Sequence, residues 1–267
     1  MIALAIGASA CASAPPAPQR VVAVPLPFEQ KMATILRLED RRVLHDPAAA
    51  VPPPPPPAAA GRRAPVVTPP PAPDDLLRLL GDGEARVRRR AALAVGRVGL
   101  PDGVQPLVAV LADPDPEVRQ MAAFALGLIG DKSARDSLVT ALSDRSPLIQ
   151  GSAAEALGLI GDPAAAGAIG RLVAQIVESG ALSEPPGEAE DTRRDTPASA
   201  FRLAVYALVR LKAYDQLAAA VLDPSGQPRV RWWPVAFALQ RLENKRALNA
   251  LITLAKDAHP LRAQAAR

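Results

Sequence analysis

Apolar side chains recur with a helical period through most of the chain after residue 74. Between residues 118 and 129 they stand at i, i+3, i+4, i+7, i+8 and i+11, the spacing of one face of an α-helix. These positions are Val118, Met121, Ala122, Ala125, Leu126 and Ile129. Asp115 and Pro116 precede this stretch and Gly130 follows it, which is typical of a helix start and a helix end. The pattern predicts one amphipathic helix bounded by tight turns.

A second and shorter pattern precedes the first. Its apolar residues stand at i, i+3, i+4 and i+7, and they are Val104, Leu107, Val108 and Leu111. We therefore expect a unit of two helices. Because two helices cannot bury both apolar stripes between themselves, successive units are expected to stack on one another.

The helix pair is repeated at a period of 31 residues. Residues 79–99, 110–130 and 141–161 align without gaps. The columns that agree are Leu80, Leu111 and Leu142; Asp82, Asp113 and Asp144; Val87, Val118 and Ile149; and Gly99, Gly130 and Gly161. Four columns at one period indicate a true internal repeat.

The same motif returns after an interruption. Residues 204–212 and 235–243 both match residues 122–130. From Glu155, the third unit's equivalent of Phe124, to Tyr206 is 51 residues, so we infer one insertion of about 20 residues. The polar segment 179–197 is its natural place, and it is expected to be a mobile surface loop. Repeats one to three are thus assigned to residues 74–178.

Repeats four and five are assigned to residues 198–267, which also begin a sixth unit. One more period from Phe237 falls just past Arg267, so we expect the chain to be a fragment at its C-terminal end. The sequence predicts about five helix pairs in all.

The first 20 residues are apolar and small, as in a signal or lipoprotein-type segment. Cys11 follows Ala8-Ser9-Ala10, which resembles a bacterial lipoprotein box with Ala8 where leucine is usual. Either Cys11 is lipidated and tethers the protein to a membrane, or a plain secretory signal is removed together with it. In both cases we expect export to the periplasm or cell envelope.

Residues 21–45 include an amphipathic helix, with Met32, Ile35, Leu36 and Val43 on one face. A lone helix of this length is marginal in water, so it is expected to dock on the exposed first repeat. Residues 46–73 are a Pro-rich region, containing the run Pro52 to Pro57, and are expected to lack a folded core. A semi-rigid spacer is favoured over a ligand for an aromatic groove.

Composition excludes some classes of function. Basic and acidic residues are interspersed, 31 against 27, rather than gathered in a basic stripe, so no nucleic-acid partner is expected. Aromatic residues make up 3% of the chain, which favours packed helices over strands. A single cysteine excludes a disulfide within the chain.

The motif DPDPEVRQMAAFALGLIGD, with its short period, resembles the HEAT-like repeats first described in phycobilisome lyases. The resemblance covers about residues 74–267. It implies an all-α fold, a right-handed α-α superhelix of the HEAT-like solenoid type. It implies little about activity, because function lies in sites built on a fold.

Three activities are associated with proteins of similar organisation. Bilin lyase activity is poorly supported for an exported protein. Deoxyhypusine hydroxylases bind iron through His-Glu pairs, whereas His45 and His259 are not followed by glutamate. The N-terminal arrangement is similar to exported proteins that continue into a cyclophilin-type prolyl isomerase domain, which these residues do not contain.

No sequence motif indicates a catalytic centre, a phosphate-binding loop or a metal site. We therefore predict no catalytic residue, no metal, no cofactor and no small-molecule substrate. The GxxG pairs, such as Gly127 and Gly130, are better explained by close packing and helix termination than by a nucleic-acid-clamping loop.

Two clusters are candidate partner-binding residues. The first is Arg86, Arg88, Arg89 and Arg90 on the first repeat, which suits an acidic partner, phosphate groups or an anionic lipid surface. A solvated face bonded to neighbouring acids is the favoured alternative.

The second cluster is Arg231, Trp232 and Trp233, which holds both tryptophans of the chain. Trp and Arg are common interface anchors. Consecutive helix residues point about 100° apart, so one ring is expected in the core and the other partly exposed. The hypothesis that follows is a non-enzymatic protein-protein interaction or scaffold module. A prolyl isomerase with its catalytic domain elsewhere is the alternative, ahead of a bilin lyase-like or nucleic-acid-binding solenoid.

Overall fold

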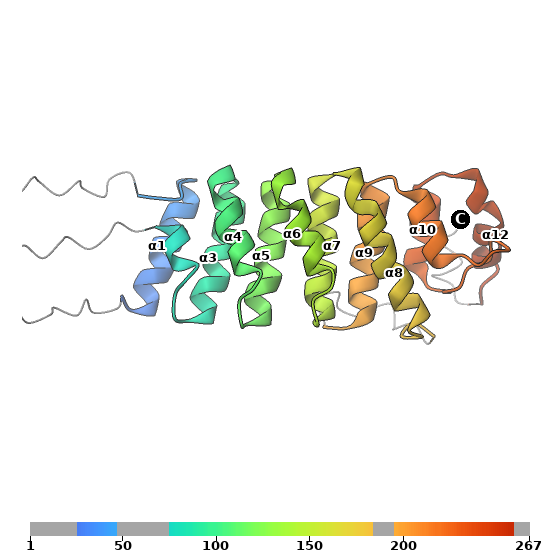
Figure 1. Ribbon diagram of the computed structural model, residues 1–267, viewed down its shortest axis with the longest axis horizontal. Helices are drawn as coiled ribbons and strands as arrows, with labels where there is room; N and C mark the ends of the chain where they lie inside the picture. The colour runs from blue at the N-terminus through green and yellow to red at the C-terminus, as the bar shows by residue number, and fades with distance from the viewer. Residues whose placement is uncertain (1–25, 47–74, 184–194, 259–267) are drawn as a thin grey trace, which may run out of the picture. The chain divides into compact units, whose positions relative to one another are not determined.

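The computed structural model describes residues 26–46, 75–183 and 195–258, and its helices lie in two parallel layers (Figure 1). We call the layers A and B. The A helices are α1 (Phe28–Asp40), α3 (Ala85–Val98), α5 (Pro116–Ile129), α7 (Pro147–Ile160), α9 (Pro197–Arg210) and α11 (Trp233–Arg241). The B helices are α2 (Leu76–Leu79), α4 (Val104–Val110), α6 (Arg135–Ala141), α8 (Ala166–Glu178), α10 (Tyr214–Val221) and α12 (Leu248–Ala255).

Short 3-10 turns precede four of the B helices. They are η1 (Pro101–Gly103), η2 (Lys132–Ala134), η3 (Pro163–Ala165) and η4 (Lys245–Ala247). From α3 to α12 the described chain forms five helix pairs, and no strand occurs in the described ranges. The predicted all-α solenoid of stacked pairs is confirmed.

Close contacts between A helices hold the stack together. Helix α3 packs on α5, α5 on α7, and α7 on α9. A Cβ atom added to Gly127 would lie 2.8 Å from the Cα of Ala156 on the next helix, and Gly96 and Gly158 face the next A helix in the same way. The glycine column therefore sets a short spacing between A helices.

The second glycine of each GxxG pair ends its helix. Gly99, Gly130 and Gly161 have φ of 76°, 76° and 74°, the left-handed conformation that glycine adopts without strain. Close packing and helix termination thus account for both glycines, as the sequence predicts.

An ion-pair ladder joins the turns that lead from B helices to A helices. Arg119, which is buried, donates from Nε to Asp144 at 3.0 Å and from Nη1 to the backbone oxygen of Asp113 at 2.9 Å. Arg88 makes the equivalent bonds one unit earlier, at 2.7 Å to Asp113. Each arginine therefore ties its own turn to the turn of the next unit, and the aspartate column of the sequence is its acceptor.

Helix α1 caps the N-terminal end of the stack. Ile35 and Leu38 are fully buried, α1 packs on α3, and Lys31 lies 2.8 Å from Asp82. The expected docking on the first repeat is confirmed. The assignment of Leu36 to the buried face was wrong, because its side chain is 54% exposed and Leu38 takes that role.

The B helix of the third repeat ends directly before the insertion expected at residues 179–197. Helix α8 runs to Glu178, longer than α4 or α6, and Leu182 beyond it is buried. Residues 184–194 lie outside the described residues. So do the N-terminal segment with Cys11, residues 47–74 of the Pro-rich region, and residues 259–267 of the expected sixth unit.

Candidate functional site

The arginines of α3 are engaged with acidic neighbours in the same chain. Arg88 pairs with Asp113, Arg89 with Glu117, and Arg90 with Glu39. Arg86 lies 3.5 Å from Glu84 and stands over the ring of Phe28. The favoured interpretation, a face bonded to neighbouring acids, is therefore confirmed, and the α3 arginines do not form an uncompensated basic patch.

The pKa values of the acids in these pairs agree with this assignment. Partial burial acts to raise the pKa of Glu39, but hydrogen bonds from Arg90 and Arg97 outweigh it and hold that pKa below its ordinary value. The pKa of Asp113 is lowered in the same way by Arg88. These carboxylates are ionised at neutral pH, and their negative charge is paired with arginines of the same chain.

The tryptophan pair lies at the start of α11. Trp232 is the N-cap residue and is 2% exposed, with its ring stacked on Phe201 of α9 at 5.9 Å between centroids. Trp233 begins the helix and is partly exposed, as the sequence predicts for one ring of the two. The two indoles therefore have different roles, one in the core and one at the surface.

Trp233 belongs to a cluster of three partly exposed rings, which we call the aromatic triad: Tyr206, Trp233 and Phe237. The ring of Tyr206 lies 6.4 Å from Trp233 and 5.6 Å from Phe237, the latter edge-on, and Trp233 lies 6.5 Å from Phe237. Such tilted and edge-on contacts are favourable for aromatic rings. The triad bridges α9 and α11 on the face of layer A that is turned away from layer B, which we call the outer face.

A change in the repeat explains why large rings gather there. Helix α9 carries Val209 at the position that Gly158 holds on α7. A valine side chain cannot make the close glycine contact, so α11 packs on α9 through larger groups. Trp232 and Phe201 occupy the repeat position of Arg119, so that a stacked ring pair replaces the ion-pair ladder at this end.

The turn before α11 is held rigidly. One carboxylate oxygen of Asp223 accepts hydrogen bonds from the backbone of Ser225 and Gln227, and Gly226 adopts a φ of 78°. The side chain of Gln227 accepts a bond of 2.7 Å from Thr253 of α12. This turn fixes the direction in which the chain enters α11 and thereby the positions of both indoles.

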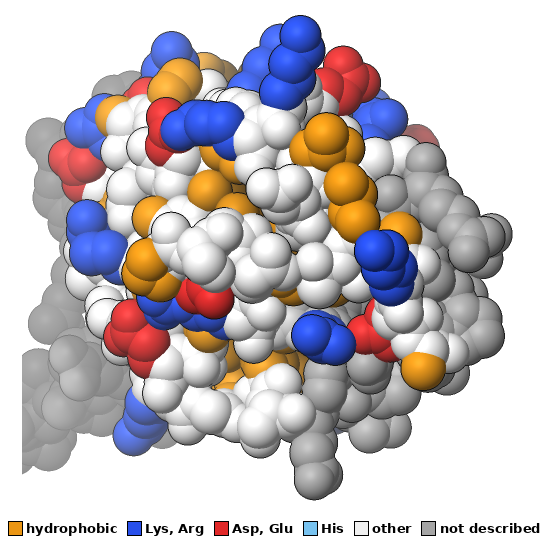
Figure 2. Space-filling view, turned by 90° about the vertical axis from the view of Figure 1, so that its right-hand side faces the viewer, with side chains coloured by type: hydrophobic (Ala, Val, Ile, Leu, Met, Phe, Trp, Pro, Cys, Tyr) orange, Lys and Arg blue, Asp and Glu red, His pale blue; other side chains and the backbone are white. Residues whose placement is uncertain are grey.

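Basic side chains flank the triad. Arg210 and Arg241 stand four residues after Tyr206 and Phe237, one helical turn along the same face, and both are exposed. Neither makes an ion pair within 4 Å to an acid of the described residues, in contrast to the arginines of α3. Arg231 is likewise exposed and unpaired there. Figure 2 faces the C-terminal end of the described chain, where Lys and Arg side chains lie around exposed hydrophobic ones.

Burial changes two acidic groups of this face. It raises the pKa of the Glu155 carboxyl on α7, although the positive charge of Arg210 partly opposes the rise. It also raises the pKa of the Tyr206 hydroxyl. Both acidic groups are thus partly shielded from solvent by the packing around the triad.

The indole N–H groups of Trp232 and Trp233 are buried and have no hydrogen-bond partner in the described structure. An unpaired buried donor costs about 1–3 kcal/mol. The sequence gives no sign of an unpaired donor at Trp232, because the residues at the same repeat position in earlier units, Arg88 and Arg119, do find acceptors in the next turn.

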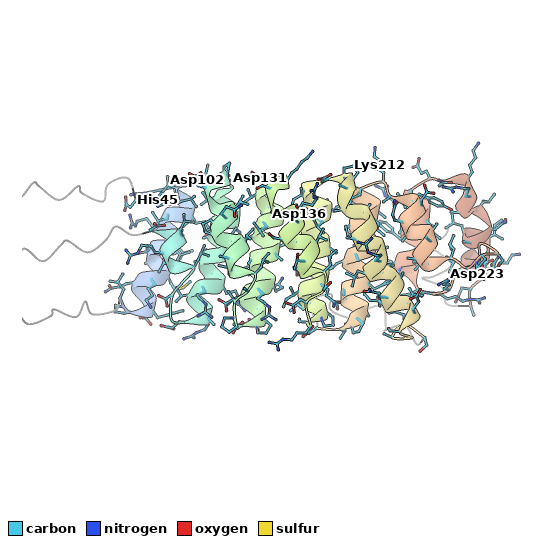
Figure 3. All side chains as sticks on the ribbon, in the orientation of Figure 1. His45, Asp102, Asp131, Asp136, Lys212 and Asp223 are labelled. Carbon is cyan, nitrogen blue, oxygen red and sulfur yellow. The ribbon has the colours of Figure 1, made fainter. Side chains whose placement is uncertain are left out.

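Polar side chains occupy the turns at the C-terminal ends of the A helices. Asp102, Asp131 and Lys212 lie along one edge of the stack, at the turns that lead from A to B helices (Figure 3). Asp131 accepts from the backbone N–H of Ser133 and so caps its 3-10 turn. Within the described residues, no three His, Cys, Asp or Glu side chains gather in a way that could hold a metal ion.

None of the helices in the described ranges combines the length and apolar composition that a membrane crossing requires.

Several residues of the site were missed by the sequence reasoning. Tyr206 and Phe237 were used as repeat markers and not as binding residues, although both are large aromatics at a column shared with Phe124. Asp195 was also missed. It stands 51 residues after Asp144, the same offset that separates Glu155 from Tyr206, and it accepts a bond of 2.9 Å from Ser146.

Two family models match the sequence. The model described as HEAT repeats matches residues 104–175, and the PBS lyase HEAT-like repeat matches residues 87–113. These stretches are HEAT-like repeats, as their period predicts. No curated protein matches the chain.

Solved structures of other proteins also match this chain. The complex of CpcE and CpcF of phycocyanin lyase from Nostoc sp. PCC7120 matches at 22% identity and a TM-score of 0.50, over 78% of this chain and 79% of that chain. An engineered protein matches at 18% identity and 0.42, over 72% and 92%. Human deoxyhypusine hydroxylase in complex with glycerol matches at 20% identity and 0.35, over 72% and 92%.

Proposed function

We propose that this chain is a non-catalytic scaffold that binds another protein through the outer face of layer A. The observation that carries the proposal is the aromatic triad, three partly exposed rings in mutual contact beside arginines that form no ion pair within the described ranges. Aromatic and arginine side chains are the residues in which interface binding energy concentrates.

A binding role also suits the form of the molecule. Stacked helix pairs offer a long, continuous surface rather than a closed pocket. The similar structure of CpcE and CpcF is a complex of two proteins, which supports association with a protein partner for this chain as well. We further propose that the protein acts after export, in the periplasm or cell envelope, with Cys11 as the site of a lipid tether.

Site-specific photocrosslinking in living cells tests the binding face. A photoreactive phenylalanine derivative would replace Phe237 on α11 in one variant and Thr140 on α6 in another. Phe237 lies in the triad, whereas Thr140 is exposed on layer B. We expect a discrete adduct from position 237 that disappears when Trp233→Ala is added, and none from position 140.

Adducts of equal yield from both positions, or none from position 237, would contradict the proposal. Circular dichroism of each variant checks that the helices are retained. Fractionation of cells carrying Cys11→Ser then tests the tether: release from the membrane fraction is expected, and unchanged membrane association would exclude a lipid at Cys11.

A further inference from the structure

We infer that the aromatic triad, together with Arg210 and Arg241, forms a docking site for an acidic amphipathic segment of a partner protein. The inference rests on the proposed function and adds the chemistry of the partner. It is carried by two observations that belong to one face: apolar rings that are only partly covered, and cations without an ion-pair partner among the described residues.

The rings and the cations lie along the same two helices. On α11, Trp233, Phe237 and Arg241 follow one another at intervals of four residues, so they share one helix face. On α9, Tyr206 and Arg210 stand in the same relation. Because Tyr206 touches both rings of α11, the two rows form one surface with apolar groups at its centre and arginines at one side.

The arginines at the two ends of the stack differ in their ion pairs within the described residues. At the N-terminal end, Glu39 bonds to both Arg90 and Arg97, and Asp113 bonds to Arg88. At the C-terminal end, Arg210 and Arg241 have no such acceptor among the described residues. The stem of Arg210 lies against α7, where a Cβ on Gly158 would be 3.4 Å from its Cδ, so Arg210 lies on the α7 side of this surface, whereas Arg241 stands on α11.

The nearest acid on this surface does not complete the pairing. Glu155 is partly buried and feels the charge of Arg210, but the two groups form no ion pair within 4 Å. An acidic segment laid across the surface would bring carboxylates to both guanidinium groups, which bind carboxylates through paired N–H donors. An apolar side chain one helical turn away on the same segment would then reach the rings.

This chemistry selects one occupant over others. A second copy of this chain would bring its own arginines against Arg210 and Arg241, and like charges placed together cost binding energy. A neutral apolar segment would leave both arginines partly desolvated and unpaired. An amphipathic segment with acidic residues beside its apolar face satisfies both the rings and the cations.

Selection from a displayed library of random peptides tests the inference with the full chain as target. We expect the enriched peptides to combine acidic residues with aromatic or aliphatic ones. Their binding should weaken by about tenfold or more in Arg210→Glu/Arg241→Glu, because the variant presents repulsive charges to them.

Arg171→Glu is the control, because Arg171 is exposed on α8 of layer B and forms no ion pair with an acid of the described residues. It replaces one arginine by glutamate away from the triad, where the double variant replaces two, so binding should change by less than about twofold. Thermal melts of both variants confirm that any loss is not a loss of fold.

The outcomes separate the two proposals. The acidic partner would be overturned if the enriched peptides were neutral or basic, or if they bound the Arg210→Glu/Arg241→Glu variant as well as the wild type. In that case, loss of binding in Trp233→Ala would still support the binding face. Enrichment of peptides that bind Trp233→Ala unchanged would overturn both. Self-association that is lost in Trp233→Ala would identify a second copy as occupant and overturn the acidic segment.

Discussion

The substitution Gly127→Ala tests whether glycine sets the spacing of the A helices. In an open helix position this change stabilises a protein by up to about 1 kcal/mol, because alanine is the better helix former. Here the new methyl carbon would lie 2.8 Å from the Cα and 3.0 Å from the Cβ of Ala156. Favourable contacts between carbon atoms need about 3.5–4.0 Å, so α5 and α7 would have to move apart.

The expected magnitude follows from these opposing effects. Overpacking of a close interface costs about 1–3 kcal/mol, and backbone atoms cannot turn aside as a flexible side chain can. After the gain in helix propensity we expect a net loss of about 1–2 kcal/mol in the free energy of unfolding. For a domain of this size that corresponds to a Tm lower by roughly 2–8 °C.

Circular dichroism during thermal and urea unfolding provides the assay, and Gly167→Ala provides the control. Gly167 lies in α8, where an added Cβ would meet only the end of the Arg171 side chain at 3.8 Å. That variant should keep or raise the Tm. If Gly127→Ala raised the Tm as Gly167→Ala is expected to do, the glycine-spaced packing of α5 on α7 would be refuted.

Four further substitutions test other parts of the structure. Asp144→Asn leaves a buried arginine without its charge partner and should cost about 2–3 kcal/mol, whereas Asp215→Asn breaks an exposed pair and should cost less than about 0.5 kcal/mol in the same urea titration. Trp233→Phe leaves Trp232 as the only indole, and its fluorescence should resist acrylamide quenching; strong quenching would contradict its burial. Because burial raises the pKa of Glu155, its ionised form destabilises the fold at neutral pH, and stability is gained as the pH falls through the folded pKa. Glu155→Gln should therefore be more stable by less than about 1 kcal/mol at pH 7, with an advantage that shrinks in melts at lower pH; a constant difference would refute the assignment.

The fold could be predicted from the sequence because it depends on local signals that recur. Asp115 caps the start of α5 and Gly130 ends this helix in the left-handed conformation, which Gly99 and Gly161 repeat at the 31-residue period. Each signal acts within one or two turns of the chain. The docking of α1 was also predictable, since its apolar face needs a partner and the first repeat is adjacent.

The site was predictable only in part. The pairing of Trp232 and Trp233 indicated one buried and one exposed ring, and this prediction is confirmed. Their contacts with Phe201 and Tyr206 depend on how far α9 lies from α11, which follows from Val209 in place of a glycine. That effect becomes visible only when the glycine column is known to face the next helix.

The charge pattern was the least predictable feature. Arg88 and Arg90 look alike in sequence, yet one reaches the turn of the next repeat and the other reaches Glu39 of α1. Glu39 is separated from Arg90 by the whole Pro-rich region, so its position depends on tertiary docking. Which arginines remain unpaired, and hence which can attract a partner, could not be read from the chain order.

Hydrogen–deuterium exchange of the protein with and without its crosslinked partner, or with an enriched peptide, tests the central claim most directly. If the outer face of layer A binds, protection should increase in α9 and α11 around Tyr206, Trp233 and Phe237, while α4 and α6 exchange as before. Protection confined to the B helices, or spread evenly over the solenoid, would contradict the assignment of the binding face.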